Sequence, residues 1–195
     1  MVKVVDGQFF AQEMPHKFKI SFSGCPIDCA RTNENDLGFQ GAVKPEWDEE
    51  TCTGCRICSK ACREGAIESD ADTGKPISDP EKCLYCGDCI RACPTDSWQA
   101  KTKGWMVRVG GRHGRHPITG HKIAEFISDE DVPIFIETIT KWYKENGKEY
   151  GRTRLGVILQ IPDKWNSFIS TLQNVFAEKI LKNPKLPSRN EIHFE

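Results

Sequence analysis

Two runs of four cysteines with identical spacing dominate this chain of 195 residues. The first run is Cys52, Cys55, Cys58 and Cys62, and the second is Cys83, Cys86, Cys89 and Cys93, followed by Pro94. The repeat extends beyond the cysteines, because Lys60-Ala61-Cys62 is matched by Arg91-Ala92-Cys93 at the same offset that separates Cys52 from Cys83. One small structural unit has therefore been used twice.

The spacing within each run, C-x2-C-x2-C-x3-C, is typical of bacterial ferredoxins that carry two 4Fe-4S clusters. Three thiolates of one run bind one cluster, and the fourth binds the other cluster. The predicted ligand sets are Cys52, Cys55 and Cys58 with Cys93, and Cys83, Cys86 and Cys89 with Cys62. Zinc is the alternative, but four ligands complete a tetrahedral zinc site and do not call for a third cysteine in each run. The sequence therefore predicts two 4Fe-4S clusters.

Composition indicates a cytoplasmic protein with no membrane span and no nucleic-acid partner. The chain is 38% hydrophobic and 28% charged, with a formal net charge of −1. It has no apolar run near the roughly 18 residues that span a bilayer, and it lacks the excess of basic residues that nucleic-acid binding favours. The first six residues contain too few apolar side chains for a signal peptide. Ten cysteines would also suit a disulfide scaffold, but their metal-ligand spacing favours a reducing compartment.

The ferredoxin-like segment, residues 49–99, has strand-like sequence on both sides and is interpreted as an insertion. Apolar and polar residues alternate over 17–23 and again over 105–110, as in half-buried strands. The predicted fold class is α+β. The predicted domains are a half-site segment at 1–48, the inserted module at 49–99, a continuation with helices at 100–182, and an extended tail at 183–195.

Helical periodicity predicts three helices after Gly120. The first is indicated by Ile123, Phe126 and Ile127, and the second by Val132, Phe135, Ile136, Ile139, Trp142 and Tyr143. Ser128 and Asp131 resemble a capping box, and Gly147 is the expected C-cap. The last helix is predicted from Asp163, with one face formed by Trp165, Phe168, Ile169, Leu172, Val175, Phe176 and Ile180. The five tryptophans, Trp98 among them, are assigned to packing.

Two cysteines, Cys25 and Cys29, remain outside the two runs. They form a C-x3-C pair with Pro26 just inside it, which predicts a helix that starts near Cys25 and places both thiolates on one face. A pair of buried structural thiols is the other interpretation of such a motif.

Residues 16–30 and Asn35-Asp36-Leu37-Gly38 resemble the siroheme nitrite and sulfite reductase family. The inserted ferredoxin-like segment is similar to that of the dissimilatory and anaerobic sulfite reductases. Residues 109–117, Val-Gly-Gly-Arg-His-Gly-Arg-His-Pro, and the helices behind them also resemble that family. The resemblance covers about residues 15–160.

The resemblance implies a third 4Fe-4S cluster, coupled to siroheme, with Cys25 and Cys29 as two of its four ligands and Cys29 as the bridge to the siroheme iron. Siroheme carries several carboxylates and sulfite is an anion, so cationic side chains are expected around them. Arg112 and Arg115 are the candidate cofactor contacts, followed by His113 and His116. The alternative is an exposed basic turn whose glycines only permit positive φ.

The chain also departs from the family pattern, which places a C-x5-C pair before the C-x3-C pair. This sequence has no cysteine before Cys25, and the family's basic sulfite ligands belong to its N-terminal half. The chain alone is therefore not expected to complete the third cluster or to reduce sulfite. A reductase N-terminal half or a partner subunit is expected to supply the remainder.

The sequence supports two alternative functions. The first is a component of a siroheme-dependent sulfite or nitrite reductase, an oxidoreductase that relays electrons through two 4Fe-4S clusters to a siroheme-coupled cluster for the six-electron reduction of sulfite to sulfide. It would take electrons from a small-molecule donor or a redox protein and act within an oligomer. The second is a non-catalytic iron–sulfur electron-transfer subunit of another redox complex, with Cys25 and Cys29 purely structural.

Overall fold

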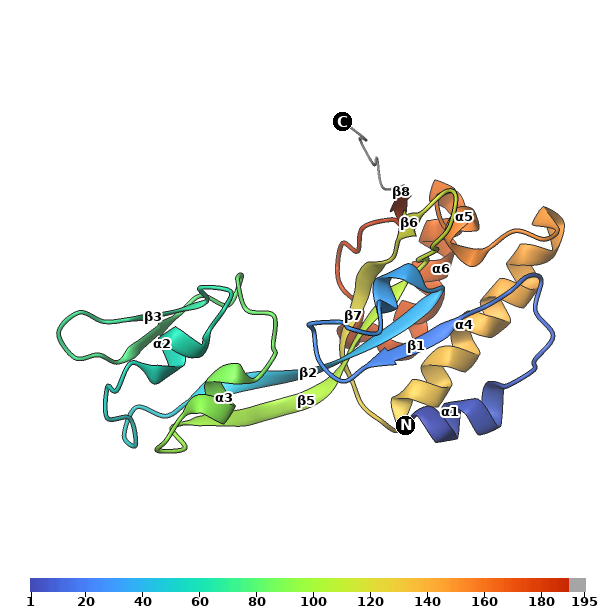
Figure 1. Ribbon diagram of the computed structural model, residues 1–195. Helices are drawn as coiled ribbons and strands as arrows, with labels where there is room; N and C mark the ends of the chain where they lie inside the picture. The colour runs from blue at the N-terminus through green and yellow to red at the C-terminus, as the bar shows by residue number, and fades with distance from the viewer. Residues whose placement is uncertain (190–195) are drawn as a thin grey trace. The chain divides into compact units, whose positions relative to one another are not determined.

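The computed structural model describes residues 1–189 (Figure 1). The chain divides into two compact units. Unit 1 contains residues 1–24, 28–40 and those from 104 onward, and unit 2 contains residues 25–27 and 41–103. The chain passes between the units at 24–28, within strand β2 (Leu37–Trp47) and within strand β5 (Trp98–Val109). The tail predicted at 183–195 lies partly outside the described residues.

A four-stranded sheet organises unit 1, in the order β1 (Ile20–Ser23), β2, β5 and β7 (His121–Ile127). Strand β1 is parallel to β2, and β5 is antiparallel to β7. The strands expected around 17–23 and 105–110 are thus both present, and they belong to one sheet. With helices packed beside this sheet, the α+β class is confirmed.

The core of unit 1 lies between this sheet and two long helices, α4 (Asp131–Gly147) and α6 (Pro162–Phe176) (Figure 1). Aromatic rings connect the layers: Phe22 of β1 stacks on Phe39 of β2 with centroids 4.7 Å apart. Phe39 meets Phe135 of α4 at 6.4 Å, and Phe135 meets Phe176 of α6 at 4.8 Å. Each fully buried large side chain contributes about 1.5–3 kcal/mol before entropy is subtracted, so this core is the main source of stability in unit 1.

The expected helix around Ile123–Ile127 is wrong, because these residues form strand β7. The pairing of β7 with β5 shifts register between Val107 and Trp105, which marks a β-bulge, and Phe126 has a left-handed φ of 53°. A bulge inserts an extra residue and breaks the two-residue alternation. Buried residues therefore recur at Ile123 and Ile127, a spacing of four that imitates a helix.

The two later helices are confirmed as α4 and α6. The expected capping box is present only in part: the Asp131 N–H donates to Ser128 Oγ at 3.3 Å and Ser128 Oγ donates to the Asp131 carboxylate at 2.7 Å, but the N-cap residue of α4 is Glu130, whose side chain makes no capping hydrogen bond. Gly147, the expected C-cap, is instead the last residue of α4, and the C-cap is Lys148. The chain continues through a 3₁₀ turn, η2 (Lys148–Tyr150), and leaves it at Gly151, which has a positive φ of 58°.

On α6 the expected apolar face is largely correct. Trp165, Phe168, Ile169, Leu172 and Phe176 are buried, whereas Val175 is 52% exposed. Ile180 lies beyond the helix, after η3 (Ala177–Lys179), and bridges to Ala124 of β7.

The remaining elements of unit 1 are short. They are α1 (Val2–Phe9), η1 (Thr32–Glu34), β6 (Ile118–Thr119), α5 (Leu155–Ile158) and β8 (Ser188–Arg189). Strand β8 pairs antiparallel with β6, so this part of the predicted tail packs against unit 1 of the same chain. Among residues 1–189, no helix is both long and apolar enough to cross a membrane.

Unit 2 contains two five-residue helices, α2 (Ile57–Ala61) and α3 (Asp88–Ala92), which pack against each other. It also contains a two-stranded sheet of β3 (Ile67–Ser69) and β4 (Pro76–Ser78). Its buried apolar cluster is small and consists of Cys58, Ile67, Cys89 and Trp98.

A buried ion pair connects distant segments of unit 1. Arg154 donates to both carboxylate oxygens of Asp36, at 2.8 and 2.5 Å, and the Lys19 N–H donates to Asp36 Oδ2 at 2.8 Å. The Asp36 side chain is completely buried, and the Arg154 side chain is 13% exposed. Burial raises the pKa of the Asp36 carboxyl, and the hydrogen bonds from Arg154 oppose that rise. The hydrogen bonds from Arg154 and Lys19 offset part of the free-energy cost of removing the Asp36 carboxylate from water.

We predict that Arg154→Met destabilises unit 1 by about 3–5 kcal/mol, because it leaves the Asp36 carboxylate buried without a counter-ion. Denaturant unfolding followed by circular dichroism measures this change. The matched control is Glu149→Gln, which removes a partner of Lys164 from an ion pair in which Glu149 is 60% exposed. The control should change stability far less. Equal effects of the two substitutions would contradict the prediction.

Candidate functional site

Eight of the ten cysteines line two cavities within unit 2. One cavity, of about 270 Å³, is bordered by Cys62, Cys83, Cys86 and Cys89. The other, of about 10 Å³, is bordered by Cys52, Cys55, Cys58 and Cys93. Each cavity draws three cysteines from one run and the fourth from the other run. This is the grouping that the cysteine spacing predicts for two clusters.

The loops around the two cavities have the same backbone geometry. Left-handed residues recur at equivalent positions of the two halves, as Gly54 with Tyr85, Arg56 with Gly87, and Gly65 with Asp96. Arg56 and Gly87 stand directly before α2 and α3, where the backbone must reverse to pass from the cysteine loop into the helix. The repeat seen in the sequence is therefore also a repeat of conformation.

Main-chain hydrogen bonds around the cavities follow the same repeat. The Asp48 N–H donates to the carbonyl of Ser97, and at the equivalent position of the second half the Asp79 N–H donates to the carbonyl of Ala66, both at 2.8 Å. Each bond joins a residue that precedes one run to a residue that follows the other run. These hydrogen bonds therefore connect the two halves of unit 2, just as each cysteine set combines residues from both halves.

Backbone N–H groups point at several of the cysteine sulfurs. The Ala66 N–H donates to Cys62 Sγ at 3.3 Å, and the Tyr85 N–H donates to Cys83 Sγ at 3.4 Å. Burial raises the pKa of Cys93, but backbone and side-chain donors outweigh it and lower the pKa to about 7. The backbone donors are the N–H groups of Trp98, Thr95 and Ser97. Such donors favour the thiolate, which is the form that binds iron.

For other cysteines that line the cavities, burial disfavours the thiolate relative to the neutral thiol. Burial raises the pKa of Cys58 and of Cys86, and it raises the pKa of Cys89 to about 12. A thiolate in such a position needs a cation, and a bound metal supplies that charge and removes the proton outright. The donor set therefore fits iron–sulfur clusters.

In the part of the chain that the structure describes, no three His, Cys, Asp or Glu side chains converge on one point as the ligands of a single metal ion do. In a 4Fe-4S cluster each cysteine binds a different iron atom, so the four sulfurs surround a space without meeting at its centre.

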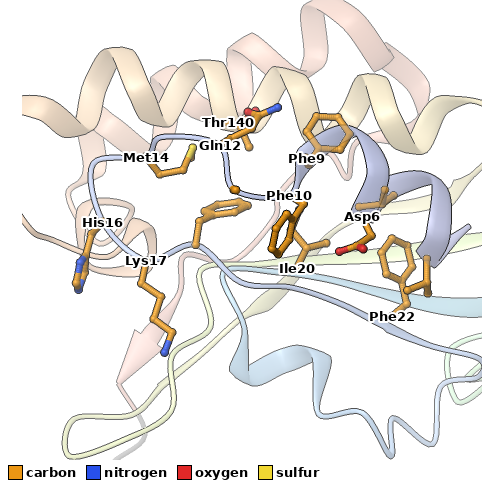
Figure 2. Close-up of a pocket in the computed structure, with 14 residues that line it drawn as sticks. Asp6, Phe9, Phe10, Gln12, Met14, His16, Lys17, Ile20, Phe22 and Thr140 are labelled. Carbon is orange, nitrogen blue, oxygen red and sulfur yellow. The ribbon is translucent and has the colours of Figure 1, made fainter.

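A third cavity, of about 560 Å³, lies in unit 1 and has a different character. Figure 2 shows Phe9 of α1, Ile20 of β1 and Thr140 of α4 around this space. Most of its lining is apolar, and none of the cysteines or arginines predicted to bind cofactors belongs to it. The cavity therefore offers no cysteine for cluster ligation.

Comparison with known proteins shows the family to which the chain belongs. A family model described as the nitrite and sulphite reductase 4Fe-4S domain matches residues 1–173. The chain belongs to this family. Membership in the nitrite and sulphite reductase family supports iron–sulfur cluster binding by this chain.

Individual relatives are sulfite reductases. The coenzyme F420-dependent sulfite reductase of Methanocaldococcus jannaschii is 34% identical over 160 residues, which cover 82% of this chain and 25% of that protein. The C subunit of the anaerobic sulfite reductase of Salmonella typhimurium is 38% identical over 134 residues, which cover 67% of this chain and 40% of that subunit. The chain thus spans a quarter to two fifths of the length of these two relatives.

Among solved structures, the crystal structure of dissimilatory sulfite reductase I matches with a TM-score of 0.64. The match covers 100% of this chain and 51% of that chain, at 19% sequence identity. At this identity the likeness shows a shared fold.

Cys25 and Cys29 do not lie on a helix, so that expectation is wrong. Residues 24–30 form bends and turns after β1, and Asp28 has a left-handed φ of 58°. The Asp28 carboxylate accepts the Thr32 N–H at 2.9 Å, which stabilises the turn in place of a helix. Cys29 is exposed and Cys25 is partly exposed, so the expectation that this pair is a buried structural one is not met either.

The glycine-rich turn packs against the segment that follows Cys29. A Cβ on Gly111 would lie 2.2 Å from the Asn33 carbonyl oxygen, and the Gly120 N–H donates to the same oxygen at 2.8 Å. Arg112 forms a bridge with Ile118 through its backbone and is partly buried, whereas Arg115 is exposed.

Both histidines of this turn are exposed, and His113 Nδ1 lies 3.2 Å from the Glu34 carboxylate. The turn and the residues after Cys29 are thus neighbours in unit 1.

The assignment of Trp98 to packing alone was incomplete. Trp98 packs against Trp47 with ring centroids 6.5 Å apart, but it also borders both cysteine-lined cavities. The signal in the sequence is its position five residues after Cys93. The matching position, five residues after Cys62, is Ile67.

We predict that Gly54→Ala disrupts the first cysteine loop. Its φ is +69° and a Cβ would lie 2.2 Å from the backbone oxygen of Thr73, so the loop must move. Gly65→Ala is the control, because φ is +61° but no atom lies within 4 Å of the added Cβ; it should cost only about 1–2 kcal/mol. Iron retention during anaerobic heating measures both. The prediction fails if Gly54→Ala retains iron as well as Gly65→Ala does.

Proposed function

We propose that this chain is an iron–sulfur component of a siroheme-dependent sulfite or nitrite reductase. In this proposal Cys52, Cys55, Cys58 and Cys93 bind one 4Fe-4S cluster, and Cys83, Cys86, Cys89 and Cys62 bind the other. The observation that carries it is the pair of cavities, each lined by one complete, crossed set of four cysteines. The two clusters relay electrons toward a siroheme-coupled cluster for the six-electron reduction of sulfite to sulfide.

Cys25 and Cys29 are proposed as two of the four ligands of the third cluster, with Cys29 bridging to siroheme. Their exposure in a turn of the described structure leaves them accessible to such a group. Siroheme, when bound, supplies the iron at which sulfite is reduced. Arg112 and Arg115 contact its carboxylates through charge-assisted hydrogen bonds in this proposal, and the packing of their turn against Asn33 supports it.

The remaining ligands and the basic sulfite site are proposed to come from a reductase N-terminal half or a partner subunit. We place the assembly in the cytoplasm as an oligomer, with a small-molecule donor or a redox protein as its electron source. Segment 49–99 is proposed as the inserted electron-transfer module, segments 1–48 and 100–182 as the half-site that surrounds the third cluster, and 183–195 as an extended tail. The sulfite reductase relatives support a partner subunit.

A second candidate is a non-catalytic electron-transfer subunit of another redox complex. The observation in its favour is that eight cysteines form two complete ligand sets, whereas Cys25 and Cys29 make up only half of a third set. The two candidates share the ferredoxin-like clusters and differ only at this third site.

We predict that the chain reconstituted anaerobically binds two clusters, which correspond to about eight irons, and that Cys58→Ser lowers this number to about four. A serine hydroxyl is a poor ligand for a soft iron site. Because metal–ligand energy is folding energy in so small a unit, unit 2 should also melt earlier. Iron analysis and thermal unfolding measure both effects. Cys25→Ser is the control and should keep the full iron content; retention of all iron by Cys58→Ser would refute the ligand assignment.

We also predict that siroheme and sulfite turnover appear only when a chain that supplies the missing half is co-expressed. In that complex Cys29→Ser should abolish siroheme absorption and turnover, while the signals of the two ferredoxin-like clusters stay unchanged. Visible spectra, electron paramagnetic resonance and sulfide production report these outcomes. Wild-type siroheme content and turnover in Cys29→Ser would remove the bridging role and favour the second candidate.

A further inference from the structure

The internal repeat of unit 2 is broken at one buried position beside the cysteines. Ile67 of the first half corresponds to Trp98 of the second, and both follow the last cysteine of their run by five residues. Ile67 borders only the cavity of Cys62, Cys83, Cys86 and Cys89. Trp98 borders both cavities. An aliphatic side chain in one half is thus replaced by an indole in the other.

The indole N–H of Trp98 is a buried donor without a normal hydrogen-bond partner. Trp98 is 6% exposed, and its Nε1 atom has no partner among the described residues. Leaving such a donor unsatisfied is energetically unfavourable. Trp98 belongs to the same buried cluster as Cys58 and Cys89, one cysteine from each ligand set. The repeat relates the cavity that Ile67 borders to the cavity of Cys52, Cys55, Cys58 and Cys93 for Trp98, and Cys58 is the member of that set that lies in the buried cluster with the indole.

We propose that the Trp98 indole N–H is a hydrogen-bond donor to the sulfur of Cys58 when a cluster is bound, and that it raises the reduction potential of that cluster above that of its twin. This inference rests on the proposed presence of the two clusters and goes beyond it. Hydrogen bonds to the sulfurs are among the main determinants of cluster potential.

The direction of the effect follows from charge. One-electron reduction makes the cluster and its thiolates more negative. An N–H donor therefore stabilises the reduced state more than the oxidised state. Ile67 offers no such donor beside the other ligand set. The electron should therefore reside preferentially on the cluster of Cys52, Cys55, Cys58 and Cys93.

The decisive substitution is Trp98→Phe, which keeps an apolar aromatic ring but deletes the N–H. An anaerobic redox titration of the full chain, followed by electron paramagnetic resonance, measures the two midpoint potentials. We expect one midpoint to fall and the other to stay nearly unchanged. Unchanged midpoints, or equal shifts of both, would overturn the proposal.

Trp47→Phe is the matched control. Trp47 contacts Trp98 and its Nε1 atom is likewise buried without a partner, but Trp47 is not among the residues that line either cavity. This substitution should leave both midpoints in place. A shift as large as that of Trp98→Phe would attribute the effect to packing and overturn the hydrogen bond.

A second measurement uses the unsubstituted chain and so does not depend on how the variant folds. When tryptophan is labelled with ¹⁵N in the indole ring, pulsed electron paramagnetic resonance of the reduced protein should detect a ¹⁵N coupling to one cluster. Lack of any coupling would overturn the proposal. If the wild-type chain bound no cluster at all, iron analysis would show it, and the proposed function would fall together with this inference.

Discussion

The exchange of one cysteine between the two runs, so that each cavity is lined by three cysteines of one run and one of the other, is the constraint on which unit 2 depends. Its helices have five residues and its two-stranded sheet has three residues in each strand. Isolated helices of this length are not stable in water, and the buried apolar cluster is small and includes two of the cysteines themselves. If the proposed clusters are bound, bonds between iron and thiolate supply much of the folding free energy of unit 2. Because each cavity takes its fourth cysteine from the other run, neither half can complete its set of four cysteines alone.

Unit 1 is stabilised in the opposite way, by a large apolar core and one buried carboxylate. The Asp36 carboxylate accepts hydrogen bonds from the Lys19 N–H and from the Arg154 side chain. The backbone carbonyl of Asp36 accepts the Gly110 N–H at 2.9 Å. These contacts fix the segment before β1, the start of β2, the end of β5 and the start of α5. The turn with Cys29 leads through η1 to Asp36, and the glycine-rich turn begins at Gly110. One buried residue therefore anchors both turns of the proposed cofactor site.

The features that could be predicted from the sequence are those set by local spacing. Cysteine spacing determines which thiolates reach the same space, and the grouping in the two cavities follows it. Helices α4 and α6 could be predicted because their apolar periodicity extends over four turns. The failures occur where one residue changes the backbone: the bulge near Phe126 makes a strand imitate a helix, and left-handed Asp28 replaces a helix with a turn. Helix α1 was missed because only Val5 of its residues is buried.

A repeated unit also limits which residues can give electron transfer between the two proposed clusters a direction. Two halves with the same loops, the same left-handed positions and the same crossed hydrogen bonds would bind two clusters of equal potential, and electrons would have no preferred resting place. Any preference must come from positions at which the repeat is broken. Exposed differences between the halves are screened by solvent, so buried differences next to the sulfurs matter most. Among residues that border the cavities, the exchange of Ile67 for Trp98 is such a difference: it introduces a polar group into the buried cluster between the two ligand sets.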